Sequence, residues 1–155
     1  MQDCPPATDL GGSDPEAWHS MPVLRADWMR RRRCVDVSPL GNGTTEIWAM
    51  FRDTIAESDG AEVVLHEYSL SLSLVTSDDE GPLIATVEAT PHVLPFPECP
   101  AAATAVAALA GHRLLALPSL VPHVLEGVGS CTHLNDLLRS VGGGAPSMVA
   151  AGTAG

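Results

Sequence analysis

From residue 66 to residue 74 the chain reads His66-Glu67-Tyr68-Ser69-Leu70-Ser71-Leu72-Ser73-Leu74. The three leucines alternate with three serines, which is the period of a strand with one buried face and one solvated face. By the same parity, His66 and Tyr68 share the leucine face. The stretch predicts a half-buried strand that begins with a histidine.

Further strands are predicted on both sides of this stretch. The turn Asp78-Asp79-Glu80-Gly81 leads into a partner strand from Leu83 to Thr90, and such a hairpin is antiparallel. Upstream, Cys34-Val35-Asp36-Val37 predicts a short strand that stops at Ser38-Pro39. After the Gly41-Asn42-Gly43 turn, an extended pattern returns from Thr44 to Ile55.

The sequence after the hairpin predicts three helices. The first runs from Cys99 to about Ala110, and the second begins at Leu117. Ser130 caps the third, which we expect to end near Val141. A sheet followed by helices is typical of an α+β fold. We expect three to five mostly antiparallel strands packed on three C-terminal helices, with the leucine face beneath them.

The length of 155 residues fits one domain with irregular ends. Residues 1–27 are rich in Pro, Gly, Asp and Ser and show no periodicity, so we expect a disordered leader. Residues 28–141 form the single α+β domain. The run Gly142-Gly143-Gly144-Ala145-Pro146 predicts a flexible tail over residues 142–155.

Charge and hydropathy exclude several classes of partner. The formal charge is −11, and general nucleic-acid binding needs a positive face. The longest apolar stretch, Ala101–Ala110, is shorter than the roughly 20 residues that span a bilayer. The N-terminus has no apolar signal stretch, and four cysteines do not make a disulfide scaffold. We expect a cytoplasmic protein with a small-molecule substrate and no nucleic-acid or membrane partner; a homo-oligomer is left open.

Two cysteines lie at predicted helix starts, where backbone N–H groups stabilise a thiolate. Cys99 opens the first helix and Cys131 opens the third. Each is a candidate metal ligand or nucleophile, with a buried, unreactive thiol as the alternative. His133 follows Cys131 by two residues and is a candidate fourth ligand or acid/base group; the alternative is a partly exposed histidine at the cap.

His66 completes the candidate site. A histidine on a covered face needs a hydrogen-bond partner or a metal. The strand order should bring His66, Cys99 and Cys131 to one end of the sheet, where mixed His and Cys ligands suit zinc or iron. The run from Arg30 to Arg33 is a solvated face, a partner for acidic segments or a site for an anionic ligand; Arg30 and Arg31 are the candidate substrate-binding residues.

Several short motifs resemble domain-of-unknown-function family 2889 (DUF2889). They are Met29-Arg30-Arg31 with Val35-Asp36-Val37, Leu65-His66-Glu67, Val87-Glu88-Ala89, Pro95-Phe96-Pro97-Glu98-Cys99-Pro100 and Gly129-Ser130-Cys131-Thr132-His133-Leu134-Asn135-Asp136-Leu137-Leu138. The resemblance covers about Met29 to Val141. As the name says, it implies no activity.

The element order also resembles, more loosely, the iron–sulfur scaffold fold of the NifU and IscU type. That resemblance implies a metal or cluster site whose positions here would be His66, Cys99 and Cys131, with His133 nearby. A histidine in place of a cysteine moves the site towards a single metal ion.

We therefore expect a small zinc- or iron-dependent enzyme, a lyase or hydrolase, acting on an organic metabolite in aromatic or specialised metabolism. The alternatives are a non-catalytic metal or iron–sulfur carrier and a metal-free ligand-binding domain.

Overall fold

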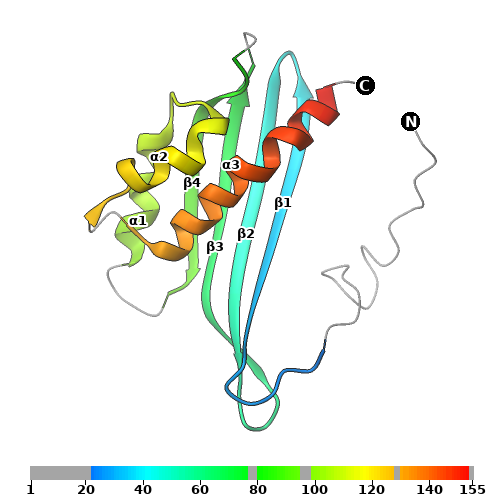
Figure 1. Ribbon diagram of the computed structural model, residues 1–155, viewed down its shortest axis with the longest axis vertical. Coiled ribbons are helices and arrows are strands. Elements are labelled where there is room, and N and C mark those ends of the chain that lie inside the picture. The colour runs from blue at the N-terminus through cyan, green and yellow to red at the C-terminus, as the bar shows by residue number, and fades with distance from the viewer. Residues whose placement is uncertain (1–21, 77–79, 95–98, 128–129, 154–155) are drawn as a thin grey trace, which may run out of the picture.

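The computed structural model describes residues 22–76, 80–94, 99–127 and 130–153. Four strands pair in sequence order into one antiparallel sheet, and helices follow them (Figure 1). The strands are β1 (Met29–Gly41), β2 (Thr44–Ala56), β3 (Glu62–Val75) and β4 (Leu83–Val93). The α-helices are α1 (Cys99–Ala105), α2 (Leu117–Val124) and α3 (Thr132–Thr153), with 3-10 turns at Val106–Leu109 and Leu114–Ala116. The predicted α+β class is confirmed.

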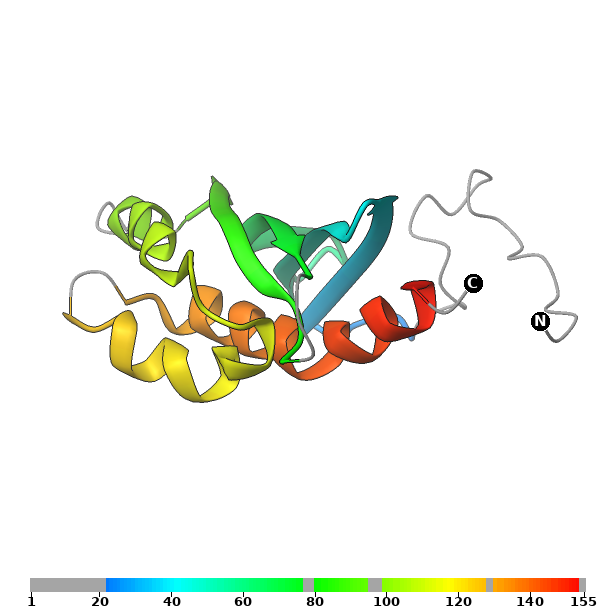
Figure 2. The same cartoon turned by 90° about the horizontal axis from the view of Figure 1, so that it is seen from above.

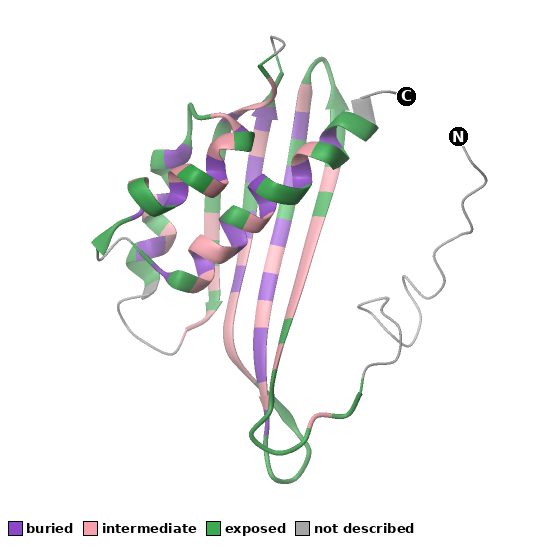
Figure 3. Cartoon of the chain, viewed as in Figure 1, coloured by how far each residue is buried: buried purple, intermediate pink, exposed green. Residues whose placement is uncertain are grey.

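The core lies between one face of the sheet and the helices. The alternating stretch forms most of β3, and its three leucines are fully buried. Opposite them, α3 contributes Leu134, Leu137, Leu138 and Val141. Figure 2 shows α2 and α3 on the same side of the sheet. In Figure 3 most buried residues lie on the helices and on the strands behind them, whereas the loop between β2 and β3 is exposed.

Strand β1 is longer than expected at both ends. It begins at Met29 and continues through Ser38 and Pro39 almost to the turn. We expected Pro39 to end the strand because proline lacks a backbone N–H. However, β1 is an edge strand that pairs only with β2, and edge strands tolerate proline because only one side of the strand needs hydrogen bonds to a partner.

Helix α3 also continues past its predicted end. Residues 142–153, expected as a flexible tail, extend the helix to Thr153. Ala145 and Val149 are buried in the core, and this packing outweighs the low helix propensity of the three glycines. Most of the expected leader, residues 1–21, lies outside the described residues. Among the described residues, no helix is both long enough and apolar enough to cross a membrane.

Candidate functional site

One cross-strand row of the sheet is polar although it lies on the face that the helices cover. Arg31 of β1 pairs with Asp53 of β2, and Asp53 pairs with His66 of β3. Two residues further along, Phe51 and Tyr68 stand on the same face, and both are fully buried. The polar row therefore marks the end of the sheet face at which the apolar core stops.

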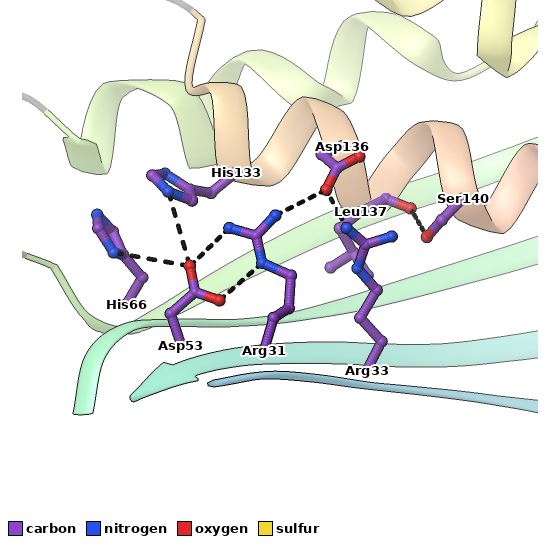
Figure 4. Close-up of polar contacts among 8 residues, drawn as sticks. All are labelled: Arg31, Arg33, Asp53, His66, His133, Asp136, Leu137 and Ser140. Carbon is purple, nitrogen blue, oxygen red and sulfur yellow. Dashed lines mark hydrogen bonds and ion pairs between the residues drawn. The ribbon is translucent and has the colours of Figure 1, made fainter. Parts of the chain in front are cut away.

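Helix α3 begins above this row and delivers His133 in its first turn (Figure 4). The His133 ring stacks on the His66 ring with 3.9 Å between centroids, and on Phe51 with 5.9 Å. His133 Nε2 lies 3.7 Å from Asp53 Oδ2, and His66 Nδ1 lies 4.0 Å from the same oxygen. Two imidazoles from different elements thus face one carboxylate oxygen.

Asp53 forms a bidentate ion pair with Arg31. Arg31 Nε donates to Oδ1 at 2.7 Å, and Nη2 donates to Oδ2 at 2.6 Å. The Asp53 side chain is only 3% exposed. Burial alone would raise the pKa of Asp53, but the hydrogen bonds and charge of Arg31 outweigh burial and hold the pKa below its ordinary value. Asp53 is therefore an ionised, fixed carboxylate.

Asp136 ties the start of α3 to the same network. It stands one helical turn after His133 and accepts a hydrogen bond from Arg31 Nη1 at 3.0 Å and another from Arg33 Nη2. Figure 4 shows the resulting chain of contacts from His66 and His133 through Asp53 and Arg31 to Asp136. The network fixes the helix start relative to β1 and β2.

Both histidines have features that suit a metal ligand. Burial lowers the pKa of His133, and the charge of a protonated His66 would lower it further, while Asp53 opposes the shift. His66 Nδ1 is buried and has no hydrogen-bond partner within the described part of the chain. An unpaired polar atom in such a place is costly, and a metal ion would satisfy it.

Asp53, His66 and His133 each offer one ligand atom, and these atoms all lie within 4.8 Å of one another. Two ligand atoms about 2.1 Å from one zinc ion at a tetrahedral angle are about 3.4 Å apart. The separations of 3.7 and 4.0 Å from Asp53 Oδ2 are slightly longer, and the ligand atoms of the two histidines lie within 4.8 Å of each other, so side-chain rotations would bring the three donors to one ion. One carboxylate and two imidazoles form a donor set that zinc and iron accept.

The structure brings together two of the residues singled out in the sequence, His66 and His133. Cys131 is not part of this group: it precedes α3 and lies in the hydrophobic core with only 8% of its surface exposed. The side chain of Cys99 lies outside the described residues. The ligand set of His66, Cys99 and Cys131 therefore stays a prediction.

The arginine run divides between the two faces of the sheet. Arg31 faces the histidines, whereas Arg30 donates to Glu62 Oε1 at 2.7 Å and to the backbone oxygen of Pro22. Arg30 and Arg31 both line an open hollow of about 310 Å³, together with Met29 and Asp53. Their assignment as substrate-binding residues stays a prediction.

Asp53 was missed in the sequence, although a signal for it existed. On β2, every second residue from Thr45 to Phe51 is buried, and Asp53 continues that parity. A carboxylate in line with apolar residues at the end of a covered strand face needs a buried partner. The alternation in β2 therefore pointed to a buried charge.

The comparisons with known proteins identify the family. A family model described as "Protein of unknown function (DUF2889)" matches residues 29–145. No curated protein and no solved structure matches the chain, so the looser resemblance to the iron–sulfur scaffold fold stays a prediction. Because the match runs from the first strand into the last helix and includes Asp53, His66 and His133, the chain belongs to the DUF2889 family.

Proposed function

We propose that this protein is a small metal-dependent enzyme that binds one zinc or iron ion through Asp53, His66 and His133 and acts on an organic metabolite. The observation that carries the proposal is the buried Nδ1 of His66, which lacks a hydrogen bond among the described residues. It faces a buried carboxylate and a second imidazole, His133, whose pKa is lowered by burial, which favours its neutral form. Neutral imidazoles and an ionised carboxylate are the forms that bind metals.

Three protein ligands leave at least one position for water or substrate, which is typical of a catalytic site rather than a structural one. The ion would act as a Lewis acid or lower the pKa of bound water. Both actions serve hydrolase and lyase chemistry. Arg31 occupies one lone pair on each oxygen of Asp53, and both histidine nitrogens face Oδ2, so the ion would bind through Oδ2.

The position of the site supports access by a small molecule. The polar row stands where α3 begins, at the limit of the helix-covered core, and the hollow beside Asp53 is open to solvent. The described cysteines, Cys34 and Cys131, are free thiols, which suits a reducing cytoplasm.

Cobalt(II) titration of the metal-free protein tests the ligand set. A thiolate ligand gives cobalt a strong sulfur-to-metal charge-transfer band in the near ultraviolet, whereas carboxylate and imidazole ligands do not. We expect the unmodified protein to bind one cobalt ion per chain without that band. The variants His66→Ala and His133→Ala should lose tight binding of cobalt. The matched control Cys131→Ser should bind cobalt as the unmodified protein does. A sulfur band that disappears in Cys131→Ser would contradict the proposed ligands.

Turnover is tested separately from binding. The zinc- and iron-loaded forms are incubated with small organic acids, esters and hydroxy compounds, and products are followed by mass spectrometry with and without chelator. We expect conversion that depends on the metal and is lost in His133→Ala. Tight binding of the ion without conversion of any compound would favour a metal carrier instead.

A further inference from the structure

The hollow beside Asp53 has the features of a ligand site. Its lining comprises Met29, Arg30, Arg31 and Asp53, and its volume of about 310 Å³ is at the lower end for small-molecule pockets. Asp53 is at once part of this wall and part of the proposed metal centre. A molecule in the hollow would therefore lie next to the ion.

Arg31, which lines the hollow, retains hydrogen-bonding capacity. A guanidinium has five N–H groups, of which Asp53 takes two and Asp136 takes one. Two N–H groups have no partner among the residues that the structure describes, and the side chain is 38% exposed. The planar guanidinium suits oxygen atoms of an acid group, and its delocalised charge persists at every physiological pH.

Charge balance also favours an anion here. In the metal-free site, Arg31 and Arg33 are matched by Asp53 and Asp136 through ion pairs. A divalent ion would add two positive charges without a matching carboxylate. In a half-buried site an uncompensated charge is unfavourable, so an anionic ligand would bind more tightly than a neutral ligand of the same shape.

Met29 supplies the apolar part of the wall, and the fourth lining residue is Arg30. Met29 lies two residues before Arg31 on β1 and hence on the same face, beyond the start of α3. Its side chain is exposed, as are those of the neighbouring Trp28 and of Val63, which lies in the same cross-strand row through Ile55. A ligand with a hydrocarbon body would cover apolar surface on this part of the sheet.

We infer that the substrate is a small organic carboxylate, whose acid group binds the free N–H groups of Arg31 and whose apolar body lies on Met29. This inference rests on the proposed metal site, because the ion supplies both the charge excess and the reactive centre. It narrows the substrate from any organic metabolite to a carboxylic acid with a hydrocarbon part.

Three test ligands separate the contribution of the acid group from that of the apolar body. Phenylacetate has both, phenylacetamide lacks the charge, and acetate lacks the apolar body. Binding to zinc-loaded protein is measured by calorimetry and ligand-observed NMR. We expect phenylacetate to bind at least about tenfold more tightly than phenylacetamide, which corresponds to about 1.4 kcal/mol, and more tightly than acetate. Removal of zinc should weaken phenylacetate more than phenylacetamide.

Two variants locate the ligand. Met29→Ser should weaken phenylacetate several-fold and leave acetate and zinc binding unchanged, with Met148→Ser, an exposed methionine on α3, as the matched control. Arg31→Lys, compared at equal zinc content, should reduce the preference for phenylacetate over phenylacetamide.

The outcomes distinguish this inference from the metal proposal. Normal zinc binding with equal affinity for phenylacetate and phenylacetamide would overturn the carboxylate inference and leave the metal centre standing. Normal phenylacetate binding in Met29→Ser would likewise overturn the assigned position. Failure to bind either zinc or iron would overturn the proposed function, and the inference with it.

Discussion

Arg31 orients the proposed metal ligand Asp53. Replacement of Arg31 should therefore lower the affinity for the metal ion. Partners that orient a metal ligand typically contribute 10–100-fold to metal affinity. We expect Arg31→Gln to weaken zinc binding by about that factor, because Asp53 loses both hydrogen bonds that orient it. Calorimetry checks this, with the exposed Arg139→Gln as control. Tighter binding in Arg31→Gln would show instead that the guanidinium competes with the ion.

The lowered pKa of His133 predicts a pH dependence of stability in the metal-free protein. Folding holds the pKa of His133 below its ordinary value of 6.5, so the unfolded chain binds the proton more readily than the folded chain. Stability should therefore fall as the pH decreases below about 6.5, and stay high above it. Denaturant unfolding in the presence of chelator, at about pH 8 and about pH 5, measures the effect.

The variant His133→Gln supplies the comparison for that measurement. It cannot take up a proton, so the loss of stability between the two pH values should be smaller than in the unmodified protein. An equal loss in both proteins would show that His133 does not contribute.

The packing of α3 on α2 gives a prediction about two neighbouring glycines. A Cβ at Gly142 would stand 2.6 Å from Leu117 Cβ and 2.7 Å from Pro118 Cδ, whereas a Cβ at Gly143 would meet nothing within 4 Å. We expect Gly142→Ala to destabilise the protein by about 1–3 kcal/mol because the helices must separate. Gly143→Ala should stabilise it by up to about 1 kcal/mol through helix propensity. Chemical denaturation of both variants measures the difference.

A result in which both alanine variants are stabilising would mean that α3 does not pack on α2 at Gly142. It would also restore the expectation of a loosely attached C-terminal segment.

The elements that the sequence predicted well are those with strong local patterns. The alternation in residues 66–74 and the glycine-rich turns specify β3 and its hairpins because side-chain period and turn geometry are local properties. The end of α3 was missed for the opposite reason. The glycines at 142–144 signal a break locally, but burial of Ala145 and Val149 is a tertiary effect.

The site was predictable only in part for a similar reason. His66 and His133 stand out because His66 opens the alternating leucine stretch and His133 lies at a predicted helix start. The predicted strand start at His66 was wrong, since β3 begins at Glu62, where it pairs with Ala56 of β2. The contact of the two histidines with Asp53 depends on the register between β2 and β3 and on where α3 crosses the sheet. Neither is encoded in a short window of residues. Cys131, which has the same local context as His133, instead lies in the core.

At the scale of the whole protein, the three proposed metal ligands come from three different elements, β2, β3 and α3. A bound ion should therefore stabilise the packing of the helix on the sheet. An ion that binds only the folded chain, at about 100 times its dissociation constant, adds about 2.7 kcal/mol to stability. We expect zinc to raise the melting temperature of the wild-type protein and chelator to reverse the rise. In His66→Ala the melting temperature should not respond to zinc, and an equal rise there would place the ion elsewhere.

The position of the ion itself is measured by anomalous X-ray scattering from a crystal grown with zinc, with data collected on both sides of the zinc absorption edge. We expect one strong anomalous peak per chain, about 2.0–2.2 Å from Asp53 Oδ2, His66 Nδ1 and His133 Nε2. A peak bonded to the sulfur of Cys99 or Cys131, or no peak in the presence of excess zinc, would contradict the assignment of the metal centre.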